Sequence, residues 1–227
     1  MSYSPTKDSN WLYEHKKIVT SQFGEDGIIE KIFEIVETKN KWCVEFGADN
    51  GVTLSNTWNL IINKGWHGIA MERNPVPFPV MQFIYKDHPV VCLNENVECE
   101  GSNKLDSILQ RYAIPKDFDF ISIDVDSYDY QIWKSFVEYT PSVVCIEFCQ
   151  TFKYEEEFIY GQDKIHAGSS LASIVNLGRR KGYELVCVIG VNAFFVLSHL
   201  YPLFEIWSND VANYNEYILE GDGEPMQ

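Results

Sequence analysis

The chain has 227 residues, with 33 acidic against 18 basic side chains and a formal charge of −15. A hydrophobic fraction of 45% and an aromatic fraction of 15% exclude a disordered acidic segment. The acidic surplus argues against non-specific nucleic-acid binding and against attraction to anionic membranes, because both need a basic face. We therefore expect one folded domain over residues 1–227, a length that single α/β domains commonly reach.

The sequence carries no targeting or membrane signal that we can recognise. Residues 1–17 are polar and charged, without the apolar core of a signal peptide. The longest apolar runs have the length of strands and fall far short of the ~20 residues that span a bilayer. Six cysteines show no C-x-x-C spacing, and most of them sit in apolar runs. This usage is typical of reduced, buried thiols and favours a cytoplasmic location.

The predicted elements alternate between short apolar runs and longer amphipathic ones. In chain order we expect a helix over 27–37, a strand over 42–46, a helix over 55–64, strands over 67–71 and 89–93, a helix over 104–112, a strand over 118–125, a helix over 129–139, a strand over 142–148, a helix over 170–181, and strands over 183–189 and 193–197. The last two strands are so close that they predict an antiparallel hairpin. Strands alternating with helices predict an α/β fold with a mostly parallel sheet that is covered on both faces.

Acidic residues stand where the predicted parallel strands end. Four of the five strands end in or just before a carboxylate: Glu45, Glu72, Asp124 and Glu147. Asp126 and Asp129 follow Asp124, and acids so close repel one another unless they are solvated, protonated or beside a cation or donor. The alternative for these two is a helix N-terminus whose dipole favours acids. Ligands of such sheets bind beyond the carboxyl ends of the strands, so this row predicts the site.

A glycine-containing turn follows the first strand. Gly47 and Gly51 flank Asp49, and the dinucleotide fingerprint Gly-x-Gly-x-x-Gly is not met. An acid-rich turn suits a cationic ligand better than a diphosphate. Glu72, at the end of the second strand, is well placed to accept hydrogen bonds from a ribose diol. The alternative is that Glu72 is only a solvated carboxylate at the end of a strand.

Four stretches of the sequence resemble class I S-adenosylmethionine-dependent methyltransferases, and within them the FkbM-like group. The matching stretches are Ser21-Gln22-Phe23-Gly24-Glu25-Asp26-Gly27, Val44-Glu45-Phe46-Gly47-Ala48-Asp49-Asn50-Gly51 with Ser55-Asn56-Thr57, Gly65-Trp66-His67-Gly68 leading to Glu72, and Ser122-Ile123-Asp124-Val125-Asp126. The resemblance implies a Rossmann-like sheet of seven strands, mostly parallel, with an antiparallel last strand and helices on both faces. Asp49 departs from the family, which often has glycine at that position.

The resemblance also implies where S-adenosylmethionine binds. Glu45, Gly47 and Gly51 would frame its methionine end, and Glu72 would hold the ribose hydroxyls. Asp124 would lie beside the sulfonium and the acceptor. The cofactor-binding residues that we predict on this basis are Gln22, Glu45, Gly47, Asp49, Gly51, Ser55, Asn56, Glu72, Asn96, Val97 and Asp124.

A hydroxyl acceptor needs a base or a metal ion to lose its proton. The candidate catalytic residues are Asp124, Asp126, Asp129 and His166. His166 belongs to the segment 151–168, which we predict as a lid, although a lone histidine in a loop is more often a surface residue. A Mg²⁺ ion held by Asp124, Asp126 or Glu147 is the alternative to a base, because hard oxygen ligands suit this ion.

The sequence favours O-methylation of a hydroxyl on a small polar acceptor, such as a sugar or glycoconjugate. Two alternatives stay open: a catalytically silent nucleotide-binding or scaffold protein of the same fold, and an NAD(P)-dependent oxidoreductase. The expected partner is a small-molecule or carbohydrate acceptor, with neither nucleic acid nor membrane. The segments 74–86, 151–168 and 201–217 are expected to shape its site, and residues 1–20 and 201–227 are expected to be terminal extensions.

Overall fold

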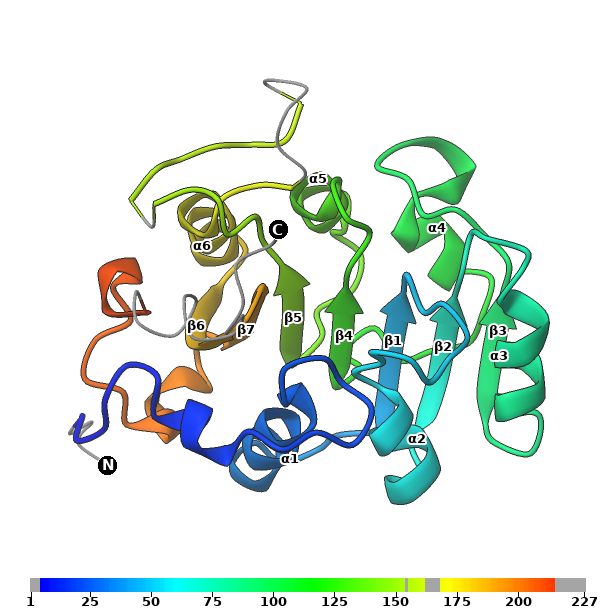
Figure 1. Cartoon of the computed structure of the whole chain (residues 1–227), viewed down its shortest axis with the longest axis horizontal. Helices are drawn as coiled ribbons and strands as arrows, with labels where there is room; N and C mark the ends of the chain where they lie inside the picture. The colour runs from blue at the N-terminus through cyan, green and yellow to red at the C-terminus, as the bar shows by residue number, and fades with distance from the viewer. Residues whose placement is uncertain (1–4, 154, 162–167, 215–227) are drawn as a thin grey trace, which may run out of the picture.

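The computed structural model of the chain describes residues 5–153, 155–161 and 168–214. Their centre is a seven-stranded sheet with the strand order β3-β2-β1-β4-β5-β7-β6 (Figure 1). The strands are β1 (Trp42–Phe46), β2 (His67–Met71), β3 (Val90–Leu93), β4 (Phe120–Ile123), β5 (Val143–Glu147), β6 (Tyr183–Ile189) and β7 (Asn192–Leu197). Strands β1 to β5 pair in parallel, and β7 is antiparallel to both of its neighbours. The predicted α/β fold and its terminal hairpin are confirmed.

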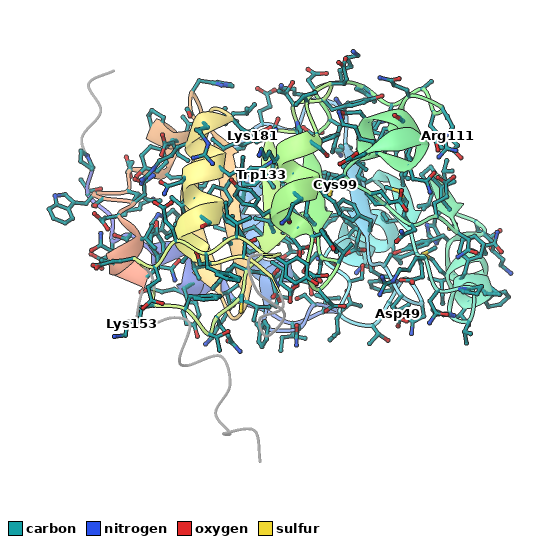
Figure 2. The ribbon with its side chains drawn as sticks, turned by 90° about the horizontal axis from the view of Figure 1, so that it is seen from above. Asp49, Cys99, Arg111, Trp133, Lys153 and Lys181 are labelled. Atoms are coloured by element: carbon teal, nitrogen blue, oxygen red, sulfur yellow. The ribbon has the colours of Figure 1, made fainter. Side chains whose placement is uncertain are left out.

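Helices cover both faces of the sheet. They are α1 (Glu25–Ile35), α2 (Trp58–Lys64), α3 (Phe78–Tyr85), α4 (Leu105–Leu109), α5 (Asp129–Ser135) and α6 (Leu171–Arg180), with short 3-10 helices η1 (Trp11–His15), η2 (Gly101–Asn103), η3 (Tyr201–Phe204) and η4 (Val211–Tyr214). Buried side chains of α4, α5 and α6 form one apolar layer, and those of α1, α2 and α3 form the other. Helices α5 and α6 lie side by side with Trp133 between them (Figure 2).

The strands are mostly apolar because both faces of the sheet are buried. In β1, Val44 and Phe46 belong to the layer under α4–α6, whereas Cys43 belongs to the layer under α1–α3. This alternation follows from the two-residue period of a strand. Glu45, the one charged side chain of β1, is 5% exposed and lies near the carboxyl end of the strand.

Helix α3 was not predicted from the sequence. Residues 74–86, which contain prolines 75, 77 and 79, were expected only to shape the acceptor site, yet Pro77 precedes a helix here and Pro79 lies in its first turn. A proline fits there because the first-turn N–H groups have no partner inside the helix. Met81 and Tyr85 of this helix are buried, and the Tyr85 hydroxyl donates to the Gly51 carbonyl oxygen at 2.7 Å. The helix therefore supports the glycine turn.

The two terminal segments meet at the β6 edge of the sheet. Lys7 forms an isolated bridge with Ile206, and both η1 and η3 pack against β6. The six cysteines are unpaired, with Cys43, Cys145 and Cys187 buried. Among the described residues, no helix combines the length and the apolar character needed to cross a bilayer.

Candidate functional site

A cavity of about 580 Å³ opens at the carboxyl ends of β1, β2 and β4. All but two of the predicted cofactor-binding residues line it: Glu45, Gly47, Asp49, Ser55, Asn56, Glu72, Asn96, Val97 and Asp124. Gln22 is exposed and Gly51 is buried, and neither lines this cavity. Lining residues that were not predicted to bind the cofactor include Thr53, Leu54, Arg73 and Ser122. Ser122 was visible as the one polar residue inside an apolar strand.

The glycine turn brings the ends of β1 and β4 into close contact. Gly47 has φ +76°, and a Cβ there would lie 1.9 Å from the carbonyl oxygen of Asp124. Gly51 has φ +80°, and its Cβ would lie 2.8 Å from the Tyr85 ring. Gly51 thus serves the packing of the turn on α3, which explains why it does not face the cavity. Asp49 takes a positive φ of 44° without being glycine.

The Glu45 carboxylate holds the segment that leads into α2. It accepts hydrogen bonds from the Ser55 hydroxyl, the Asn56 N–H and the Thr57 hydroxyl, each at 2.7 Å. Burial raises the pKa of Glu45, and the three hydrogen bonds act in the opposite direction. With most of its acceptor capacity used, Glu45 shapes the cavity wall by fixing the backbone around it.

Glu72 plays the corresponding part at the end of β2. One carboxylate oxygen accepts from the Asp49 N–H at 2.9 Å, and the other accepts from the Asn74 N–H at 2.6 Å. A carboxylate oxygen has two lone pairs, so each of these oxygens keeps one for a ligand hydroxyl. Glu72 therefore joins the glycine turn to the β2 turn and still offers two acceptors to the cavity.

A second cavity of about 320 Å³ adjoins the first, between the segment that follows β3 and the start of α5. The two cavities share Arg73, Asn96, Val97 and Val125. Most of the remaining wall of the second cavity is apolar or aromatic and includes Cys99, Tyr128 and Ile132. An acid-lined space thus continues into one that suits a flat, weakly polar group.

The segment before α1 is fixed by its acids and does not reach the main cavity. One carboxylate oxygen of Asp26 accepts from the N–H groups of residues 19, 20 and 21 and from the Ser21 hydroxyl, at 2.6–2.9 Å. Thr20 in turn donates its hydroxyl to the Ser55 carbonyl oxygen at 3.0 Å. Asp26 therefore ties this segment to the residues that Glu45 holds, whereas Gln22 points to solvent.

Three carboxylates meet beside the main cavity, between the ends of β4 and β5. One oxygen each of Asp124, Asp129 and Glu147 lies within 4.8 Å of the others. Burial, followed by the charge of neighbouring carboxylates, raises the pKa of both Asp124 and Glu147, which share a hydrogen bond. Burial raises the pKa of Asp129 to about 7. Of the group predicted to hold Mg²⁺, Asp126 is exposed, and Asp129 takes its place in this cluster.

The candidate catalytic residues thus divide by position. Asp124 and Asp126 line the main cavity, whereas Asp129 is buried and accepts a hydrogen bond from the Val125 N–H at 2.8 Å. His166 lies outside the described residues. Of the predicted lid, Tyr160 packs edge-on against Tyr128, and its carbonyl oxygen accepts from Gln131 at 2.7 Å.

Solved structures with similar folds are methyltransferases. An S-adenosylmethionine-dependent methyltransferase from Clostridium acetobutylicum ATCC 824 matches with a TM-score of 0.51 and 10% identity, over 79% of this chain and 92% of that one. The CMeT domain of the citrinin polyketide synthase matches with a TM-score of 0.51 and 11% identity, over 76% of this chain and 51% of that one. This chain thus corresponds to about half of the citrinin structure.

No family model matches the chain, and no curated protein matches it either. At such low identity, the likeness to solved structures concerns the fold. The fold is that of Rossmann-like methyltransferases, and the FkbM-like resemblance stays a prediction from the sequence.

Proposed function

We propose that this chain is an S-adenosylmethionine-dependent methyltransferase. The observation that carries the proposal is the charge of the main cavity in a fold of this kind. Its wall contains one guanidinium, Arg73, and the carboxylates of Glu45, Asp49, Glu72, Glu95, Asp124 and Asp126. S-adenosylmethionine bears a cationic sulfonium and an ammonium group, so this wall attracts it electrostatically. Its volume also lies in the range of small-molecule sites.

The residues of the two cavities fit the parts of this cofactor. Glu72 keeps two lone pairs for the ribose hydroxyls, as acidic residues after the second strand do in nucleotide-binding folds. The apolar side chains of the second cavity suit the adenine ring, next to Asn96 and Val97. The turn at Gly47 and Asp49 leaves room for the methionine end beside Asp124.

We further propose a hydroxyl acceptor, with Asp124 and Asp126 as the candidate bases. When bound, the cofactor supplies an electrophilic methyl group. Both carboxylates line the cavity and can take the proton that the acceptor hydroxyl loses, whereas Asp129 is too deeply buried to meet an acceptor. A small polar acceptor such as a sugar fits the exposed, polar part of the wall at Thr53 and Asn74.

A thermal-shift comparison tests the cofactor class. We expect S-adenosylmethionine and S-adenosylhomocysteine to raise the melting temperature, because each binds only the folded chain. NAD⁺ and NADP⁺ should leave it unchanged, since the turn lacks the dinucleotide fingerprint. Stabilisation by NAD(P)⁺ alone would overturn the proposal in favour of an oxidoreductase.

A second assay tests methyl transfer. Radiolabelled S-adenosylmethionine is incubated with the chain and with a panel of sugars, other hydroxyl compounds, amines and thiols, and methylated product is counted. The Asp124→Asn variant should lose transfer and still bind S-adenosylhomocysteine, because the change removes the charge and keeps the shape. If the wild-type chain binds the cofactor and methylates no hydroxyl, amine or thiol compound, the chain is a binding protein of the same fold.

A further inference from the structure

We infer that Asp124, Asp129 and Glu147 form a binding site for one divalent cation of the oxygen-preferring class. We name these three residues the β4–β5 carboxylate cluster. Asp124 follows β4, Glu147 ends β5, and Asp129 begins α5, so three separate elements contribute one residue each. One oxygen from each lies within 4.8 Å of the others. The inference concerns cation binding alone and does not depend on the proposed methyltransferase activity.

The free oxygen of Asp129 is the second observation behind this inference. The Asp129 residue is only 1% exposed. Its Oδ1 accepts a hydrogen bond from the Val125 N–H at 2.8 Å, and its Oδ2 has no hydrogen-bond partner among the described residues. A buried carboxylate oxygen without a donor is costly, because it has left water and gained nothing in exchange. A cation between the three carboxylates would supply the missing partner.

Cationic side chains do not neutralise the cluster in the part of the chain that the structure describes. No ion pair between the described residues involves Asp124, Asp129 or Glu147. Two further acids add to the negative charge around the cluster, because the charges of Asp126 and Glu45 also raise the pKa of Asp124. Carboxylates gathered in this way need a proton or a cation, and a divalent ion neutralises two charges at once.

The spacing suits ions that take oxygen ligands. Around one ion, three equally spaced oxygens stand at most about 1.7 times the ion–oxygen distance from one another, which is about 4.0–4.5 Å for Ca²⁺ and about 3.5 Å for Mg²⁺. The three oxygens of the cluster lie within 4.8 Å of one another, so a small approach of the side chains brings them to the spacing of such an ion, with less movement for Ca²⁺ than for Mg²⁺. Water would complete the six to eight ligands of such ions.

The position of the cluster also gives a cation access to the main cavity. Asp124 lines the main cavity, whereas Asp129 belongs to neither cavity wall. An ion between them would be held from the protein side by Asp129 and Glu147 and would turn its water ligands toward the cavity. An oxygen atom of a bound acceptor is the kind of group that replaces such a water.

Mn²⁺ titration of the full chain tests the inference. Paramagnetic resonance of free Mn²⁺ gives the stoichiometry and the affinity, and calorimetry with Ca²⁺ and Mg²⁺ gives the preference. The titration is done at about 0.15 M salt, where diffuse attraction to an acidic surface is screened. The variants are Asp129→Asn and Glu147→Gln. The matched control is Asp126→Asn, which removes one charge from the same loop and keeps a residue type that tolerates its φ of +62°.

We expect one Mn²⁺ per wild-type chain, bound in the millimolar range or tighter. Each of the two variants should weaken binding by about tenfold or more, and the control by about threefold at most, because it removes a neighbouring charge and no ligand of the ion. Circular dichroism confirms that each variant is folded. Two results would overturn the inference: no binding to folded wild-type chain at millimolar Mn²⁺, or equal affinity in the wild type and in either folded variant. Absence of Mn²⁺ binding would mean that protons alone neutralise the cluster.

Discussion

Replacing Gly47 with alanine should perturb the site more than any other single methyl group. The new Cβ would stand 1.9 Å from the Asp124 carbonyl oxygen, where ordinary contacts begin at 3.4 Å. The ends of β1 and β4 would have to separate by the difference, about 1.5 Å. The residue would also be forced to keep a positive φ of 76°.

The two effects can be separated with a matched control. Gly101 has φ +75°, and a Cβ there would meet no atom within 4 Å. Gly101→Ala therefore measures the backbone cost alone, about 1–2 kcal/mol. Gly47→Ala adds the overpacking cost, about 1–3 kcal/mol, so it should be less stable than the control by that amount.

Urea unfolding of the wild type and both variants measures the free energies. Calorimetry with S-adenosylhomocysteine then measures the site, and we expect Gly47→Ala to bind at least about tenfold more weakly than Gly101→Ala, because the displaced turn changes the cavity wall. If the free energies of unfolding of the two variants differ by less than about 0.5 kcal/mol, the ends of β1 and β4 do not form this close contact.

Three further changes test two acids of the main cavity and Asp26, which holds the segment before α1. Glu45→Gln should lower the free energy of unfolding by about 1–3 kcal/mol, because an N–H₂ group takes the place of one carboxylate oxygen and cannot accept a hydrogen bond. Wild-type stability in urea would argue against this hydrogen-bond network. Asp26→Ala should lower the free energy of unfolding by about 2–4 kcal/mol. Asp26→Asn should lower it clearly less, since the amide keeps one carbonyl oxygen facing the same donors. Equal losses of stability in the two variants, measured by thermal unfolding, would contradict this. Glu72→Ala should weaken calorimetric binding of 5′-methylthioadenosine by about tenfold or more, and unchanged affinity would remove Glu72 from the ribose site.

The sequence predicted the sheet, and it put acids at the edge of the sheet where the main cavity lies, because both depend on short-range patterns. Apolar runs of strand length mark the strands, and an acid at the end of a run stays at that edge in any parallel sheet. Glu72 and Asp124 were therefore found at the cavity. Helix α3 was missed because prolines fit both a loop and a first helical turn, and only its packing on Gly51 decides between them.

The roles of the individual acids depend on tertiary contacts that no local pattern contains. Glu45 meets its three donors about ten residues later in the chain, so it supports the cavity wall as well as lining it. Asp129 meets Glu147 only because β4 and β5 are neighbours in the sheet. Gln22 was included because its stretch resembles a family, and it lies at the surface while Asp26 holds the segment.

Calorimetric titration of the full chain with S-adenosylhomocysteine is the direct test of whether the acid-lined cavity binds this cofactor. We predict one site per chain with an affinity in the micromolar range, and a weaker affinity at high salt, because carboxylates attract the ammonium group of the ligand. Absence of binding at millimolar ligand, in a sample shown to be folded by circular dichroism, would contradict the assignment of the acid-lined cavity to this cofactor.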